Sequence, residues 1–220
     1  MSGRRIVVLR PEPGASATVA SARVLGLEAT AIPLFQIEPI DWVATDGAEF
    51  DGLLLTSANA LRFGGEPLQQ LRRLPVYAIG EATAVAAQEA GFNVIATGKA
   101  GVAELVGSIA PDLRLLHLCG ADRTESARRG PAITAVVTYR AKAIADPDMS
   151  SLTGSVALIH SPRAGRRLAE LVEERSSISI AAISPAAAEA VGAGWQSVAS
   201  AERPTNDALL ALAARLCNNG

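Results

Sequence analysis

Aromatic residues are scarce in this sequence, at 4% of 220 residues. A core must therefore be built from Ala, Val, Leu and Ile, which is typical of α/β proteins whose strands are buried on both faces. Long apolar runs are missing near the N-terminus, where Ile6–Leu9 is too short for the core of a signal peptide or for a membrane span. We therefore expect a cytoplasmic protein that does not enter a membrane.

Cysteines and basic runs are also few. Cys119 and Cys217 match no metal-ligand or redox spacing, so we expect two reduced packing residues and no metal. The net charge is -2 and no stripe of Lys and Arg is visible, which argues against nucleic acid as a partner. Neither a P-loop nor a Gly-x-Gly-x-x-Gly run follows the first apolar segment, which argues against a nucleotide-binding domain.

Short apolar runs alternate with longer Ala-rich stretches of helical periodicity. This alternation predicts an α/β protein with parallel sheets flanked by helices. The number of runs exceeds what one small sheet usually holds, so two sheets in two domains are expected. The predicted strands are Ile6–Leu9, Leu53–Leu55, Val76–Ile79, Val94–Ala96, Leu115–Leu118, Ile133–Val137, Val156–Ile159, Ile180–Ile183 and Ser197–Ala199. The predicted helices are Ala15–Leu25, Ala82–Ala90, Val102–Ile109, Gly165–Glu174, Pro185–Val191 and Asn206–Leu216.

An internal repeat supports two domains. Leu54–Ser57 in the first half corresponds to Leu158–Ser161 in the second, and a second apolar run follows each at the same spacing. Gly80 ends that second run in one half and Ser184 ends it in the other. We interpret the two halves as related units.

Two extended, β-rich segments without helical rhythm, Leu34–Pro39 and Val136–Ala141, are predicted to cross between the domains. If both cross, the first strand and helix belong with the C-terminal half. The predicted domains are then 1–36 with 141–220, and 37–140.

The ordered set of these segments resembles the uroporphyrinogen-III synthase family. It covers nearly the whole chain, although no single motif is specific. The matching segments are Val8–Pro11, Leu55–Ala60, Ala78–Ala84, Gly91-Phe92, Ala103–Val106, Leu118–Arg123, Val137–Arg140, Ile159–Ser161, Ala182–Ser184 and Pro204-Thr205.

The resemblance implies two flavodoxin-like domains joined by a two-strand linker, with the substrate in the cleft between them. It implies a lyase of tetrapyrrole (heme) biosynthesis that converts hydroxymethylbilane to uroporphyrinogen III, with loss of water and inversion of ring D. It also implies no metal, no organic cofactor and a monomer.

Polar residues at predicted strand ends are the candidate site, because doubly wound sheets bind ligands beyond the carboxyl ends of their strands. Hydroxyl groups, arginines and free helix amides at such ends suit a substrate with many carboxylates. The candidates for substrate binding are Arg10, Thr56, Ser57, Gly80, Thr83, Arg123, Ser161 and Ser184. Each serine or threonine has a structural alternative, which is to cap the helix that follows.

Tyr139 is the candidate catalytic residue. Departure of the substrate hydroxyl needs a proton donor, and a phenol stays protonated at neutral pH whereas ordinary carboxyls are ionised. A packed tyrosine is the alternative. The second half also departs from the family pattern, because Ser184 and Ala187 stand where a glycine and a threonine are expected.

His117 and His160 lie in or at the end of apolar runs, without a cluster of carboxylates nearby in the sequence. We expect packed or site-lining neutral histidines and no metal site. A different class of function, a cytosolic two-domain binding or sensor protein for a small anionic ligand, fits the paired α/β halves equally well.

Overall fold

The computed structural model describes residues 4–44, 46–98, 101–122 and 130–218. The chain divides into two compact units, one formed by Met1–Gln36 with Ala143–Gly220 and the other by Ile37–Lys142. It passes from one unit to the other within strand β3 (Phe35–Pro39) and again within strand β8 (Ala132–Ala143). No helix of the described residues is long and apolar enough to cross a membrane.

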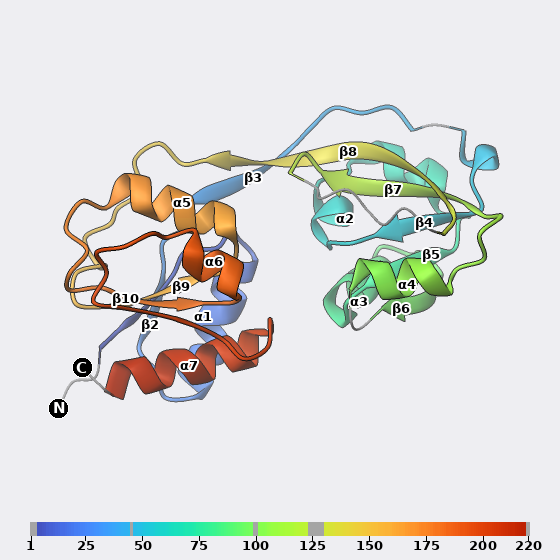
Figure 1. Cartoon of the computed structure of the whole chain (residues 1–220). Helices are drawn as coiled ribbons and strands as arrows, with labels where there is room; N and C mark the ends of the chain where they lie inside the picture. The colour runs from blue at the N-terminus through green and yellow to red at the C-terminus, as the bar shows by residue number, and fades with distance from the viewer. Residues whose placement is uncertain (1–3, 45, 99–100, 123–129, 219–220) are drawn as a thin grey trace. The chain divides into compact units, whose positions relative to one another are not determined.

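The first unit is a five-stranded sheet in the order β2-β1-β9-β10-β11, in which every pair of neighbours is parallel. Parallel neighbours require crossover connections, and helices supply those from β1 to β2 and from β9 through β10 to β11 (Figure 1). The strands are β1 (Ile6–Val8), β2 (Ala29–Ala31), β9 (Val156–Ile159), β10 (Ser179–Ala182) and β11 (Ser197–Ser200). The helices are α1 (Gly14–Val24), α5 (Pro162–Leu171), α6 (Pro185–Glu189) and α7 (Asn206–Asn218).

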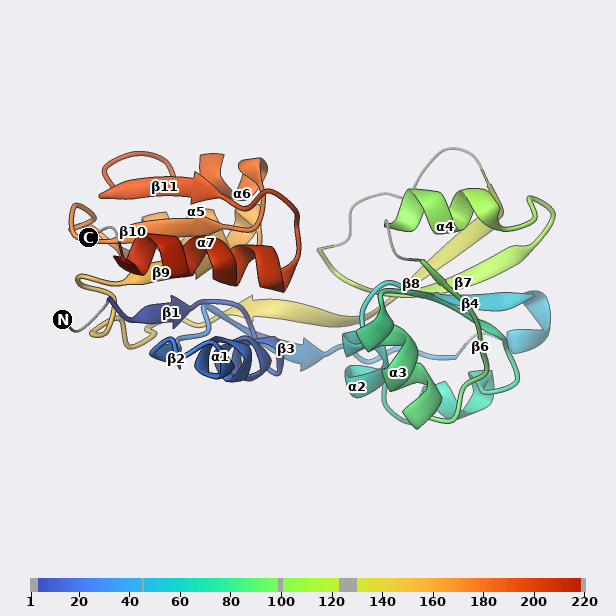
Figure 2. The same ribbon diagram turned by 90° about the horizontal axis from the view of Figure 1, so that it is seen from below.

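Helices cover both faces of this sheet. The helices α1 and α7 pack on one face, where Val19 and Leu209 bury apolar surface against Ile6 and Leu158. The helices α5 and α6 pack together on the other face (Figures 1 and 2). The central strands are therefore buried on both sides, which explains their continuous apolar runs.

The second unit contains a six-stranded sheet in the order β3-β8-β7-β4-β5-β6. Its strands besides β3 and β8 are β4 (Gly52–Leu55), β5 (Val76–Ile79), β6 (Val94–Gly98) and β7 (Arg114–Gly120). Its α-helices are α2 (Asn59–Phe63), α3 (Glu81–Glu89) and α4 (Val102–Ser108), and two 3-10 helices span Gly47–Glu49 and Glu66–Leu71.

Helices again cover both faces of the second sheet. One face packs on α2, on the 3-10 helix Glu66–Leu71 and on α3, through residues such as Leu53 and Leu116. The other face packs on α4 through Leu54 and Leu115. The neighbours from β8 to β6 are all parallel.

The outer strand β3 runs antiparallel to β8. Ile40 N–H donates to the Thr138 carbonyl at 2.9 Å, and Ile144 N–H donates to the Leu34 carbonyl at 3.0 Å. The two bonds join the late part of each segment to the early part of the other, which is the antiparallel pattern.

The two sheets share one arrangement with a different starting point in the chain. In the first unit, β9, β10 and β11 extend to one side and β1 and β2 to the other; in the second, β4, β5 and β6 extend to one side and β7 and β8 to the other. The chain enters the first unit at β1 and the second unit at β4, so the units are circular permutations of each other. The repeated sequence segments fall on equivalent strands, β4 with β9 and β5 with β10.

The predicted α/β class with parallel sheets is confirmed. A strand, an α-helix and both 3-10 helices were missed in the sequence. The strand β2 has the sequence Ala29-Thr30-Ala31, which lacks an apolar run because it lies at the edge of its sheet. The helix α2 has only five residues, too few to show a helical period.

Candidate functional site

Each sheet has a point between two neighbouring strands where the chain order reverses, and ligands of doubly wound folds bind there, beyond the carboxyl ends of the strands. In the second unit this point lies between β4 and β7. A cavity of about 210 Å³ opens at their carboxyl ends. Its lining residues all belong to the second unit: Thr56, Cys119, Gly120, Asp122, Tyr139 and Ala141.

Tyr139 lies in this cavity because β8 places it beside the last residue of β7. Gly120 pairs with Tyr139 across the two strands, just after an irregularity in the ladder. A Cβ atom on Gly120 would approach the Tyr139 ring to within 2.7 Å. Only a glycine lets the phenol lie this close to the β7 backbone.

The surroundings of Tyr139 keep its phenol protonated. Burial raises the pKa of Tyr139 above its ordinary value. The neighbouring Ser57 hydroxyl is the next largest influence and lowers the pKa, while Cys119 and Asp122 raise it and the Gly120 backbone lowers it, so the net effect is a rise. At neutral pH the Tyr139 hydroxyl is therefore a proton donor.

Thr56 is held by a histidine of the neighbouring strand. Thr56 Oγ1 and His117 Nε2 share a hydrogen bond at 3.1 Å, and His117 is 3% exposed. Ser57 uses its hydroxyl locally, because its Oγ accepts a bond from Asn59 N–H at 3.2 Å. This local bond to the first residue of α2 leaves the Ser57 proton available to a further acceptor.

Gly80 and Thr83 lie at the start of α3. Gly80 is the N-cap of this helix with φ +78°, a conformation that favours glycine, and no side chain caps the helix. Thr83 is 5% exposed and packs within the core that α3 shares with the sheet. The geometry thus presents the Gly80 backbone at the surface and directs Thr83 inward.

The equivalent point of the first unit lies between β1 and β9. Arg10 follows β1, and its guanidinium packs directly over Gly14, where a Cβ atom would lie 2.5 Å from Arg10 Nε. Burial lowers the pKa of Arg10, although an arginine remains charged at neutral pH. Among the described residues, no carboxylate forms an ion pair with Arg10.

His160 follows β9 and is close enough to Arg10 to feel its charge. Burial, reinforced by the positive charge of Arg10, lowers the pKa of His160 to about 4. The Leu158 backbone and the Asn206 side chain oppose this shift, but neither makes a hydrogen bond of standard geometry with the ring. Both ring nitrogens are buried and lack such a bond to any described residue.

Ser161 and Ser184 cap helices. Ser161 Oγ accepts from Ala164 N–H at 3.2 Å at the start of α5, and Ser184 Oγ accepts from Ala187 N–H at 3.3 Å at the start of α6. The capping alternative is therefore observed for both. The departure from the family pattern at position 184 has a local reason, because the serine supplies a cap that glycine lacks. The candidate Arg123 lies outside the described residues.

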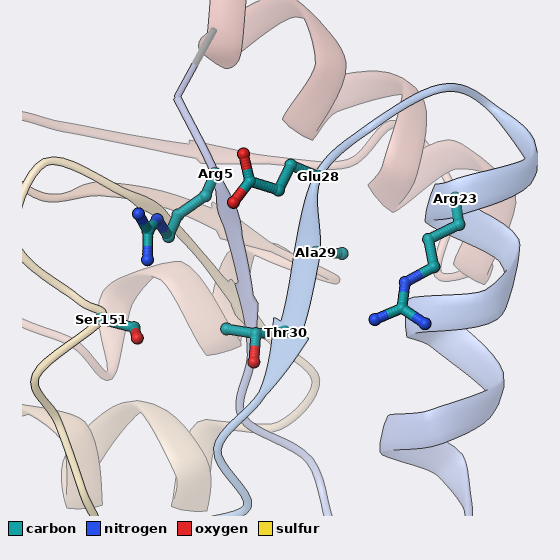
Figure 3. A pocket seen from close by; sticks show the side chains of 6 residues that line it. All are labelled: Arg5, Arg23, Glu28, Ala29, Thr30 and Ser151. Atoms are coloured by element: carbon teal, nitrogen blue, oxygen red, sulfur yellow. The ribbon is translucent and has the colours of Figure 1, made fainter. Parts of the chain in front are cut away.

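A larger cavity, of about 330 Å³, lies elsewhere on the first unit, beside the edge strand β2 (Figure 3). Arg5 and Glu28 enter it from the amino ends of β1 and β2, and Arg23 enters from α1 on the other side of the β2 ribbon. None of the candidate residues lines it. We therefore do not assign the function to this cavity. Within the described residues, no group of three His, Cys, Asp or Glu side chains could hold a metal ion.

The fold and these sites define a class: a protein of two permuted, doubly wound α/β units with polar groups gathered where the order of each sheet reverses. The family model described as uroporphyrinogen-III synthase HemD matches residues 16–211. The chain belongs to this family. No curated protein sequence matches it significantly.

Solved structures agree on the fold. The chain is similar to uroporphyrinogen-III synthetase from Helicobacter pylori, with a TM-score of 0.67, 20% identity, and coverage of 97% of this chain and 99% of that one. It is also similar to a mutant uroporphyrinogen III synthase from Thermus thermophilus, with a TM-score of 0.53, 16% identity, and coverage of 98% and 100%. At these identities the likeness concerns the fold.

The structure brings part of the predicted set together. Thr56 and Tyr139 line one cavity, with the Ser57 hydroxyl close enough to Tyr139 to affect its pKa, and Arg10 and Ser161 flank His160. Residues that the sequence analysis did not select also line the cavity of the second unit, namely Cys119, Gly120, Asp122 and Ala141. The first three had a signal, because they lie in the family-like segment Leu118–Arg123.

Proposed function

We propose that this protein is a lyase that cyclises hydroxymethylbilane to uroporphyrinogen III, with loss of water and inversion of ring D. The observation that carries the proposal is the match of the family model over residues 16–211. The similar proteins from Helicobacter pylori and Thermus thermophilus bear the name of this synthase. The substrate is a small molecule with many carboxylates, and the reaction needs neither a metal nor an organic cofactor.

We also propose that the two units are flavodoxin-like domains, 1–36 with 141–220 and 37–140, joined by two strands. The first unit supports this, because its strands in their own chain order follow 2-1-3-4-5, the flavodoxin order. The second unit reaches the same arrangement by circular permutation. The passage of the chain through β3 and β8 supports the two-strand connection. We expect a monomer.

For the chemical step, Tyr139 is the proposed proton donor. Its phenol proton passes to the oxygen of the leaving hydroxyl as the carbon–oxygen bond breaks, so the group departs as water. The unsubstituted α-carbon of ring D loses a proton when it closes the macrocycle after the inversion, and this proton restores the phenol. A donor with a raised pKa, next to the Ser57 hydroxyl, supports this role because it is fully protonated at neutral pH.

The other candidates are proposed to hold the substrate. Thr56 is oriented by His117, and the Gly80 backbone lies partly exposed at a helix start. The hydroxyls of Ser57, Ser161 and Ser184 keep a proton to donate while their oxygens accept backbone N–H bonds. Arg10 supplies charge in the first unit. Thr83 and Arg123 remain proposals from the resemblance, and the inward packing of Thr83 favours a structural part for it.

The enzyme's main task under this proposal is positioning. A linear tetrapyrrole of this kind closes without help to the type I ring, so the protein must hold ring D such that its substituted carbon attacks. Orientation by many weak contacts can lower such a barrier by several kcal/mol.

A product-isomer assay tests the proposal. Hydroxymethylbilane is generated freshly, incubated with the purified protein without added metal or cofactor, and the oxidised uroporphyrins are separated by chromatography. We expect mainly the type III isomer, formed faster than the type I product of the no-enzyme control. Only type I at the no-enzyme rate contradicts the proposal and favours a binding or sensor protein for an anionic ligand.

A further inference from the structure

The two units offer different chemistry at equivalent positions. Thr56 lies two residues after Leu54, which pairs with His117, and Cys119 lies two residues after His117. In the first unit, His160 lies two residues after Leu158, which pairs with Val8, and Arg10 lies two residues after Val8. Arg10 and His160 thus stand where the second unit has Cys119 and Thr56.

The different residues give the two sites different charges. In the second unit the side chains at the reversal point are uncharged, and the Asp122 carboxylate lines the cavity beside them. A negative group there disfavours a second carboxylate. In the first unit a guanidinium occupies the equivalent place, so the anionic parts of a ligand are favoured there.

The Arg10 guanidinium is held in place, and no anionic group of the described residues pairs with it. Its guanidinium is packed on the backbone at Gly14, which limits the rotamers it can adopt. The nearby Glu12 carboxylate is already engaged, because its oxygens accept bonds from the backbone N–H and hydroxyl of Ser16. Arg10 makes no ion pair within the described residues.

His160 adds an unsatisfied hydrogen-bonding group beside this charge. Both of its ring nitrogens are buried without a bond of standard geometry to any described residue. Buried polar groups are nearly always paired, so this ring calls for a partner. With a pKa of about 4 it is neutral at pH 7, and it carries one N–H that can donate to an acceptor beside Arg10.

We propose that Arg10 and His160 together form a carboxylate-binding site at the carboxyl ends of β1 and β9, which takes one acidic side chain of the substrate. The guanidinium supplies the charge, and the imidazole N–H supplies a directed hydrogen bond. The inference rests on the proposed function, since that names a polycarboxylate, but it concerns binding and can be tested without turnover.

Proton and anion binding are coupled at such a site. Of the charged groups in the described chain, Arg10 is the one whose charge acts on His160, and its repulsion lowers the histidine pKa. A bound carboxylate offsets that repulsion and raises the pKa of His160. By reciprocity the anion then binds more tightly as the pH falls toward the pKa of the free histidine.

The test uses the full-length protein and uroporphyrin III, an octacarboxylate, as the probe. The chain has only two histidines, so a His160→Gln variant assigns the imidazole NMR signals. We expect the pKa of His160 to be about 4 in the free protein and to rise when uroporphyrin binds. In the free Arg10→Gln variant we expect it to rise without ligand, because the neighbouring charge is gone.

Affinities provide the second readout. Arg10→Gln is expected to weaken uroporphyrin binding by about tenfold and His160→Gln by several-fold, because charge-assisted bonds are the stronger ones. Arg5→Gln, which removes an arginine at the opposite end of β1, is the matched control and is expected to change nothing. Binding by the wild type should tighten from pH 7 to pH 5, and binding by His160→Gln should not.

Unchanged affinity in both variants, together with a His160 signal that does not respond to the probe, overturns the inference. Amide spectra of the variants show whether each remains folded. If type III product forms in the isomer assay but the NMR signals of His160 do not change with uroporphyrin, the proposed carboxylate site is wrong and the proposed function is supported. If uroporphyrin binds at Arg10 and His160 but no type III product forms, the proposed function is wrong and the carboxylate site is supported.

Discussion

At the scale of single residues, the environment of each side chain decides its chemistry. Tyr139 and Tyr77 are the two tyrosines of the chain. Tyr77 lies in β5 against the core that α4 covers, whereas Tyr139 lines a cavity beside Ser57. Their chemical groups are identical, but Tyr139 lines the cavity at the carboxyl ends of β4 and β7 and Tyr77 does not.

Tyr139→Phe is expected to lower the turnover number by about a hundredfold, because it removes the proton donor and little volume. The Michaelis constant should change little, since the donor acts on the departing hydroxyl. Single-turnover measurements with freshly made hydroxymethylbilane provide the check. Tyr77→Phe is the matched control and should keep full turnover.

Unchanged turnover in Tyr139→Phe would show that Tyr139 is a packing residue. The alkaline side of the rate profile gives a separate check. Since burial raises the pKa of Tyr139 above its ordinary value, the donor stays protonated from neutral into mildly alkaline pH, and loss of this proton should not reduce turnover there.

At the scale of elements, a serine at the start of a helix can both cap the helix and donate a hydrogen bond to a ligand. Ser161 caps α5 by accepting a bond from Ala164 N–H, and its own proton remains free to donate. The capping and substrate-binding interpretations of such a serine are therefore compatible. They can be separated because one concerns stability and the other affinity.

Ser161→Ala is expected to lower the free energy of unfolding by about 1 kcal/mol, the usual effect of losing an N-cap hydroxyl. The Ser161→Thr variant should retain most of the wild-type stability, because threonine keeps the capping hydroxyl. Ser176→Ala, at an exposed position after α5, is the control and should change stability little. Denaturant unfolding measures the stability and steady-state kinetics the Michaelis constant. A stability loss with an unchanged Michaelis constant assigns Ser161 to capping alone.

At the scale of the whole molecule, the second unit is the continuous one. It is formed by Ile37–Lys142, and its two core clusters draw on residues of that range alone. The first unit is assembled from two segments that are far apart in the chain. The two units therefore differ in what they need in order to fold.

We expect a fragment of residues 37–142 to fold by itself. Its strands β4 to β7, nearly all of β8 and both covering layers of helices lie within the fragment, which lacks only the first residues of the edge strand β3 and the last residue of β8. Far-UV circular dichroism and thermal unfolding should show α/β structure and one cooperative transition. A fragment of residues 1–36 is the control and should be unfolded, because β1 and β2 lack the rest of their sheet. An unfolded 37–142 fragment would contradict the assignment of this unit as an independent domain.

Local patterns in the sequence were enough for most of the fold. Each predicted strand and helix has a counterpart in the structure, because buried parallel strands are apolar throughout and the covering helices keep a 3.6-residue period. The strand β2 was missed, because three small residues at a sheet edge carry no such pattern. Circular permutation was not predicted either, since it depends on which strands pair.

The candidate site could be predicted from the sequence only in part. That Thr56, Ser161 and Arg10 follow strand ends can be read from the chain, since the position is a local property. That Ser57 reaches Tyr139, and that His160 lies unpaired beside Arg10, depends on strands far apart in the sequence. The burial that raises the Tyr139 pKa and lowers the His160 pKa has no local signature.

The sequence by itself thus determined the α/β class, the repeated halves and the family, because these follow from local composition, period and the order of segments. Only the tertiary structure decided the pairing of β4 with β7 and of β1 with β9, and with it the chemistry of each site. Strand pairing sets distances between residues that the chain keeps far apart, and distance and burial set charge and hydrogen bonding.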